Sequence, residues 1–156
     1  MAKKVKPIPD GYHNVTPYLC VKDAASAIEF YKHAFGATER MRMADPGGRV
    51  GHAEIKIGDA LIMLADEFPE MGFLSPQSTG GSPVMLHLYV EDVDAFFNQA
   101  VAAGAKAQRL VEDQFYGDRA GKLADPFGHV WYIATHKEDV PPEEMKKRAA
   151  ALFGNS

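Results

Sequence analysis

The distribution of apolar and polar residues divides the chain into two similar halves. Each half opens with a short apolar segment, residues 16–23 in the first half and 85–92 in the second, and each segment ends in aspartate. Both segments are rich in residue types that favour β-strands. An amphipathic pattern with apolar residues at three-or-four spacing follows each of them, which predicts a helix after each strand.

The predicted helices carry matching start and stop signals. Asp23 and Asp92 stand where an N-cap accepts hydrogen bonds from free backbone N–H groups, and Gly36 and Gly104 stand where a helix ends in a left-handed turn. The two aspartates are 69 residues apart, and the two glycines are 68 residues apart. A single period therefore relates both ends, which indicates a duplicated unit.

Strands, rather than a second helix, follow each predicted helix. The alternation of polar and apolar residues and the turns at residues 45–48, 58–59 and 125–128 predict three strands in each half. These strands are expected near residues 40–43, 52–57 and 61–65, then near 108–111, 121–124 and 129–134. Each half is therefore predicted to be a βαβββ module, and the fold class to be α+β.

The remaining segments complete the expected domain organisation. Residues 68–83 are rich in proline and glycine and predict a linker loop. Residues 141–153 begin with prolines and glutamates and continue with basic residues, which favours a C-terminal helix. We expect one domain over residues 1–156, with module one at about 12–67 and module two at about 84–137.

Composition narrows the function classes. The chain has 156 residues, 46% apolar and 24% charged, with a formal net charge of −4. Mild acidity argues against a nucleic-acid partner, which requires a clustered basic surface. One cysteine excludes an internal disulfide and a cysteine-rich zinc site. The sequence shows neither a bilayer-length apolar run nor a signal peptide, so we expect no membrane association and a cytoplasmic location.

Short motifs resemble a known superfamily. The phrase Phe30-Tyr31 before Phe35-Gly36, the turn of residues 125–129 and the paired βαβββ pattern are similar to the vicinal-oxygen-chelate superfamily, over about residues 12–140. This superfamily includes glyoxalase I, extradiol dioxygenases, fosfomycin-resistance enzymes and bleomycin-resistance binding proteins. Residues 115–119 and 136–139 resemble its PhnB-like branch more narrowly.

The resemblance implies a cupped, barrel-like mixed sheet with helices outside and a ligand or metal on the concave face. Strand alternation then assigns side chains to the two sides of each sheet. Apolar residues suit the side under the helices: Leu19, Val21, Ile55, Ile57, Leu86, Leu88, Val90, Trp131 and Ile133. The other side collects polar and aromatic residues typical of a small-molecule cavity, or of a sheet face open to solvent: Thr16, Tyr18, Cys20, His52, Glu54, Lys56, Met85, His87, Tyr89, Val130, Tyr132 and Ala134.

Enzymes of the superfamily bind a divalent metal through one ligand from the first and last strand of each module. Transferred to this sequence, the four positions are Thr16, Met63 (or Ile62, one residue earlier), Met85 and Tyr132. A hydroxyl, two thioethers and a phenol are poor ligands for a hard or borderline cation. We therefore expect no metal at the usual positions and no cofactor. The alternative is a divalent metal at a displaced site made of His52, Glu54 and His87.

The remaining candidates concern an organic ligand. We expect Tyr18, His87, Tyr89 and Tyr132 to form its walls, Tyr116 to stack on it and Arg119 to bind a carboxylate or phosphonate group of it. The alternative for Arg119 is a surface ion pair with Asp118 that holds the loop. His87 is the best candidate for a catalytic residue.

Three functions remain after these steps. The first is a metal-free protein that binds a small organic molecule, and the second is a metal-dependent lyase or dioxygenase of the glyoxalase type. The third is a metal-free, isomerase-like catalyst with His87 as general base. The resemblance also implies a homodimer. The sequence leaves open the ligand, the catalytic status, and whether the cup forms within one chain or across two.

Overall fold

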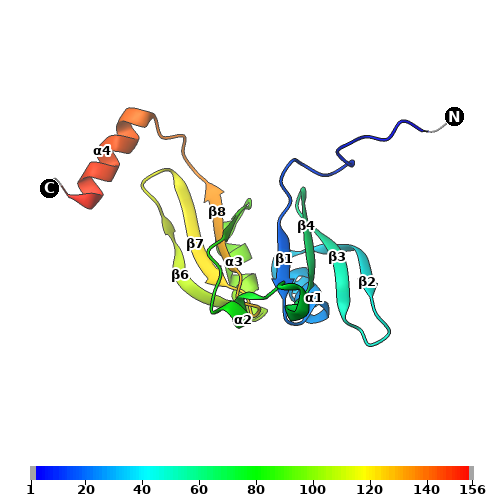
Figure 1. Ribbon diagram of the computed structural model, residues 1–156. Helices are drawn as coiled ribbons and strands as arrows, with labels where there is room; N and C mark the ends of the chain where they lie inside the picture. Colours follow the sequence, from blue (N-terminus) through cyan, green and yellow to red (C-terminus); the bar gives the residue numbers. More distant parts are fainter. Residues whose placement is uncertain (1–2, 155–156) are drawn as a thin grey trace. The chain divides into compact units, whose positions relative to one another are not determined.

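The computed structural model describes residues 3–154, which fold as two compact units with the boundary between Ser82 and Pro83 (Figure 1). The first unit contains strand β1 (Tyr18–Val21), helix α1 (Ala24–Phe35) and strands β2 (Thr38–Ala44), β3 (Val50–Ile57) and β4 (Ala60–Asp66). Its sheet has the order β1-β4-β3-β2, with β1 parallel to β4 and the other pairs antiparallel.

The second unit repeats this arrangement. It contains strand β5 (Met85–Tyr89), helix α3 (Val93–Ala102) and strands β6 (Lys106–Asp113), β7 (Asp118–Ala124) and β8 (Val130–His136). The sheet order is β5-β8-β7-β6, again with one parallel pair, β5 and β8. Helix α4 (Pro142–Phe153) completes the unit, as the sequence predicts. The duplicated βαβββ module and the α+β class are confirmed.

The segment predicted to be a linker loop is partly ordered into short elements. Phe68 and Phe73 form an isolated antiparallel bridge around the 3-10 helix η1 (Pro69–Met71). The four-residue helix α2 (Pro76–Thr79) follows, and Ser75 caps it by accepting a hydrogen bond from the backbone N–H of Ser78. The bridge fixes the position of two aromatic rings directly after β4.

The predicted helix caps are present. Asp23 accepts hydrogen bonds from the backbone N–H and the hydroxyl of Ser26, and Asp92 accepts one from the backbone N–H of Ala95. Gly36 ends α1 in the left-handed conformation, with φ of 66°. Helix α3 ends one residue earlier than predicted, because Ala103 is its C-cap and Gly104, with φ of 124°, follows.

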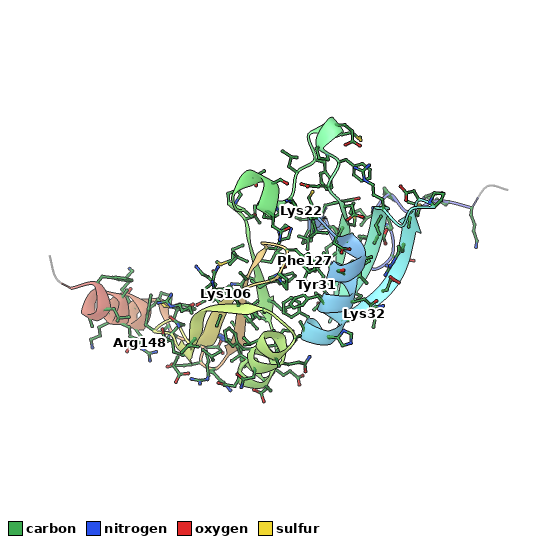
Figure 2. The ribbon with its side chains drawn as sticks, turned by 90° about the horizontal axis from the view of Figure 1, so that it is seen from below. Lys22, Tyr31, Lys32, Lys106, Phe127 and Arg148 are labelled. Atoms are coloured by element: carbon green, nitrogen blue, oxygen red, sulfur yellow. The ribbon has the colours of Figure 1, made fainter. Side chains whose placement is uncertain are left out.

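Burial follows the predicted alternation of the strands. Leu19, Val21, Ile55, Trp131 and Ile133 are all at most 5% exposed and lie on the side of their sheets that packs on α1 or α3. Tyr31 of α1, labelled in Figure 2, is fully buried in the core of the first unit. Each helix thus covers one side of its own sheet, and the other side carries the polar and aromatic set. Two small residues of that second set are nevertheless buried, Cys20 and Ala134.

Within residues 3–154, no helix has the length and apolar character needed to cross a bilayer.

Candidate functional site

Each unit presents one sheet side that its helix does not cover, and we call this side the open face. In the first unit the open face carries Tyr18, His52, Glu54 and Met63, which the strand register places side by side. In the second unit it carries His87, Tyr89, Lys122 and Tyr132. The candidate site residues therefore gather on corresponding faces of the two modules.

A chain of hydrogen bonds crosses the open face of the first unit. The Tyr18 hydroxyl lies 2.8 Å from Nδ1 of His52, and Nε2 of His52 lies 2.9 Å from the carboxylate of Glu54. The second carboxylate oxygen of Glu54 accepts a short hydrogen bond from the Tyr12 hydroxyl. Because a carboxylate only accepts, Nε2 of His52 carries the proton in this arrangement. The carboxylate thereby orients the imidazole ring toward Tyr18.

The local environment separates the acidities of these groups. The hydrogen bond from Tyr12 is the largest of several effects that lower the pKa of Glu54, followed by the hydrogen bond from His52. Burial raises the pKa of the Tyr18 hydroxyl. Glu54 is therefore ionised and Tyr18 protonated at neutral pH, and the Tyr18 hydroxyl donates its proton to Nδ1 of His52. The oxygen lone pairs of Tyr18 and Glu54 remain as acceptors for a polar ligand.

Two cavities flank this chain of hydrogen bonds. One, of about 440 Å³, lies beside Tyr18 and Ala65 and is bounded by Phe68, Met71 and Phe73 from the segment after β4. The other, of about 470 Å³, is bounded by Tyr12, Thr16, Glu54, Met63 and the residues of the leading segment. Both volumes fall in the range of about 300–1,000 Å³ typical of small-molecule sites. Apolar and aromatic walls around a few polar atoms suit an organic ligand.

An aromatic cluster occupies the open face of the second unit. The His87 ring centroid lies 4.7 Å from that of Tyr89 and 5.0 Å from that of Tyr132. The hydroxyls of Tyr132 and Tyr116 form a short hydrogen bond with each other. Burial, followed by this hydrogen bond, raises the pKa of Tyr116, which keeps its phenol protonated. Four of the expected ligand-binding side chains are thus brought together.

A buried carboxylate supports this cluster from the start of β7. Asp118 is 4% exposed and accepts hydrogen bonds from the Tyr89 hydroxyl at 2.8 Å and from Nδ1 of His136 at 2.7 Å. Nε2 of His136 lies 2.7 Å from Asp139. The hydrogen bond to Asp118 raises the pKa of Tyr89, and hydrogen bonds to both aspartates raise the pKa of His136. The orientation of Tyr89 therefore depends on Asp118.

Arg119 points away from this cluster. Its register partner is Thr135, so it projects from the helix-covered side of the sheet, whereas Asp118 projects from the open face. The Arg119 guanidinium donates two hydrogen bonds, at 2.8 and 2.9 Å, to Asp94 of α3 and one at 3.3 Å to Asp113. These bonds differ from both expectations for Arg119, which were a contact with a ligand and an ion pair with Asp118. Arg119 instead ties β7 to α3.

The strand register identifies the metal positions implied by the resemblance. Met63 pairs with Tyr18 in the first unit as Tyr132 pairs with His87 in the second, so Met63 and not Ile62 is the equivalent of Tyr132. Ile62 is 4% exposed and belongs to the core under α1. The four side chains at these positions offer two soft thioether sulfurs and two neutral hydroxyls, a set that does not fit a hard or borderline divalent cation.

The residues of the alternative metal site are engaged in other contacts. His52 and Glu54 bond to each other and to Tyr18 and Tyr12, and His87 packs on Tyr89 and Tyr132 in the other unit. In the described part of the chain, no group of three or more His, Cys, Asp or Glu side chains is arranged to hold a metal ion.

Some side chains of these sites escape sequence reasoning. Tyr12 reaches Glu54 from the leading segment, and Phe73 bounds a cavity from the segment after β4. Asp118 and His136 meet because β7 and β8 pair in a register that places them opposite each other. Of these residues, only Phe73 could have been noticed in the sequence, because it and Phe68 form an aromatic pair in a proline- and glycine-rich segment.

Two βαβββ modules, each with an open face of aromatic and hydrogen-bonding side chains, define the vicinal-oxygen-chelate class of proteins. Comparison with family models agrees, because residues 11–133 match the model described as "Glyoxalase/Bleomycin resistance protein/Dioxygenase superfamily". The chain belongs to this superfamily.

Similar proteins span most of the chain. An uncharacterized protein of Mycobacterium tuberculosis is 44% identical over 135 residues, covering 85% of this chain and 79% of that protein. The X-ray structure of an Arabidopsis thaliana gene product is similar with a TM-score of 0.62 and 29% identity, covering 79% of this chain and 98% of that one. The crystal structure of TioX from Micromonospora sp. ML1 shares the fold, with a TM-score of 0.64 and 24% identity, covering 80% and 99% of the two chains.

Proposed function

We propose that this protein binds a small organic molecule on its open faces without a divalent metal. The observation that carries the proposal is the identity of the four superfamily metal positions: Thr16, Met63, Met85 and Tyr132. Thioether and neutral hydroxyl side chains make favourable contacts with organic groups. They are poor ligands for a hard cation, because they do not compensate for the water molecules that the cation loses on binding.

The neighbouring side chains support the same proposal. On the open face of the first unit, Tyr18 offers an aromatic wall beside the hydrogen-bonding groups of His52 and Glu54. On the open face of the second unit, the walls are His87, Tyr89, Tyr116 and Tyr132. Tyr89 is 59% exposed and Met85 47% exposed in the isolated chain, so an apolar ligand gains contact area there. Burial of such area stabilises a complex by roughly 25 cal/mol per Å² before the costs of association.

Three further features belong to the proposal: a homodimer, a cytoplasmic location and a place in the PhnB-like branch. The homodimer and the branch rest on resemblance. The location rests on the sequence, which contains no apolar run long enough to span a bilayer.

Native mass spectrometry of freshly isolated protein tests the proposal. We expect a dimer mass with either no adduct or an organic adduct of a few hundred daltons. The variant Tyr132→Ala is expected to lose any carried adduct, whereas Arg119→Lys, whose side chain faces α3, is expected to keep it. A mass excess equal to one divalent ion per chain would instead favour a lyase or dioxygenase of the glyoxalase type.

A further inference from the structure

A cavity that shares Tyr132 with the superfamily metal positions lies between the β6–β7 loop, β8 and the end of α4. Its volume is about 480 Å³, and four of its lining residues are aromatic: Phe115, Tyr116, Tyr132 and Phe153. The Phe115 ring lies edge-on to Tyr116 at 5.3 Å and to Phe153 at 6.1 Å between centroids. The hydrogen bond between the Tyr116 and Tyr132 hydroxyls fixes the fourth ring, Tyr132, beside Tyr116. The rings therefore enclose the cavity from three elements.

The end of α4 contributes an apolar wall that is exposed to solvent. Leu152 is 64% exposed and Phe153 is 77% exposed, although both line this cavity. The five charged residues of α4 all lie within residues 143–148, and the helix ends in three alanines and this pair of large apolar residues. A ligand in the cavity would remove this pair from water, which favours binding.

An ion-paired arginine fastens α4 beside the cavity. Arg148, labelled on α4 in Figure 2, donates hydrogen bonds to the Glu138 carboxylate at 2.8 and 2.9 Å and to the Phe115 carbonyl oxygen at 3.2 Å. It also bonds to Glu144 at 3.1 Å. Two carboxylates thus balance the Arg148 charge, and the bond to Phe115 ties the helix to the loop that carries two of the rings.

Glu112 is the carboxylate that this cavity offers to a ligand. Its register partner is Ala120, on the open face, and it lies 3.5 Å from the guanidinium of Arg109, which also lines the cavity. Asp113, the register partner of Arg119, projects from the helix-covered side of the sheet and contacts the Arg119 guanidinium at 3.3 Å. The charge of Asp113 is therefore balanced on the other side of the sheet.

We propose that this cavity is an aromatic cage for an organic cation, such as a substituted ammonium group on an aromatic or aliphatic body. Aromatic faces attract cations through the ring quadrupole, and the Glu112 carboxylate adds a favourable charge interaction. The inference rests on the proposed function, because Tyr116 and Tyr132 belong to both sites. It adds to that function the charge of the ligand and the role of α4 as a wall.

A titration with a pair of isosteric probes tests the cage. Phenyltrimethylammonium and tert-butylbenzene have nearly the same shape and differ in charge, and binding to the full chain is followed by tyrosine fluorescence and NMR. We expect the cation to bind at least tenfold more tightly than the neutral probe. Equal affinities, or tighter binding of the neutral probe or of benzoate, would overturn the cage while leaving organic binding intact.

Variants at Phe153 distinguish the contribution of its aromatic ring to cation binding from the contribution of its apolar volume. Phe153→Tyr is expected to keep the affinity for the cation, and Phe153→Leu to weaken it by roughly two- to fivefold, as loss of one exposed cation–π contact predicts. Circular dichroism checks that α4 is retained in both variants. Equal affinities of the two variants would remove α4 from the site. A stoichiometric metal ion, measured on the same samples, would instead contradict the proposed function.

Discussion

At the scale of single residues, each module contains one buried aspartate that ties its own elements together. Asp66, at the end of β4, accepts hydrogen bonds of 2.7 Å from the backbone N–H groups of Ala24 and Val50. Asp125 accepts two from the backbone of its own turn and one of 2.9 Å from the Trp131 indole. Each carboxylate thus satisfies backbone or ring donors that would otherwise be buried without an acceptor.

Replacement of Asp66 measures the strength of this arrangement. In Asp66→Asn the amide NH₂ faces one of the two backbone N–H groups and cannot accept from it, so we expect a loss of about 1–3 kcal/mol in the free energy of unfolding. Urea denaturation compares this variant with Asp59→Asn, a change at an exposed position that should alter stability by less than about 0.5 kcal/mol. Equal midpoints for the two variants would show that Asp66 is dispensable.

His136 gives the protein a predictable pH dependence. Its pKa is raised above 6.5 by the hydrogen bonds to Asp118 and Asp139, so the folded state favours the protonated ring. The resulting stabilisation is fully present below pH 6.5 and is lost as the pH rises through the folded-state pKa. This stabilisation is measured by chemical denaturation of the wild type and of His136→Gln at several pH values from about 5.5 to 8.5.

We expect the stability difference between these two proteins to shrink as the pH rises. NMR titration of the His136 ring protons gives the folded-state pKa directly. A difference that stayed constant, or that grew at high pH, would show that the bonds to Asp118 and Asp139 do not favour the charged ring.

At the scale of elements, the strand period explains what the sequence predicts and what it does not. Alternation along β1, β3 and β8 assigns side chains to the two sheet sides correctly, because that pattern depends only on the local backbone. The alternation could not be applied to Arg119, because the sequence predicts a strand only from about Gly121, whereas β7 begins at Asp118. Asp118 and Arg119 are adjacent residues of one strand and therefore face opposite sides of the sheet.

Contacts between distant segments set a second limit on prediction. Tyr12 and Glu54 are 42 residues apart, and the Tyr116–Tyr132 pair depends on the path of the β6–β7 loop. Neither the three-or-four period of helices nor the two-residue period of strands contains such information. The helices, their aspartate caps and the repeat could therefore be predicted, but the hydrogen-bonded chains on the open faces could not.

The loop before β7 provides a test at this scale. Gly117 has φ of 99°, and a Cβ atom there would lie 2.1 Å from the Glu138 carbonyl oxygen, whereas at Gly48, with φ of 89°, it would meet nothing within 4 Å. We expect Gly48→Ala to cost roughly 1–2 kcal/mol through the left-handed backbone alone. Gly117→Ala should cost clearly more, and thermal unfolding compares the two. Equal losses would mean that the segment carrying Glu138 moves aside without strain.

At the scale of the whole molecule, duplication explains why the protein has two similar open faces with different side chains. The register pairs Tyr18 with Met63 in one module and His87 with Tyr132 in the other, so the same geometry presents different chemistry. In the superfamily such paired faces supply metal ligands, and here their side chains suit contacts with an organic molecule.

Elemental analysis tests this account most directly. Protein isolated without chelators is equilibrated with Zn²⁺ and Mn²⁺, passed through a desalting column and analysed by inductively coupled plasma mass spectrometry. We predict far less than one metal ion per chain, with no change after Met85→Leu, which preserves the apolar volume and removes the sulfur. Retention of one ion per chain, bound with low-micromolar affinity or better and lost when His52 and His87 are replaced by alanine, would contradict metal-free binding.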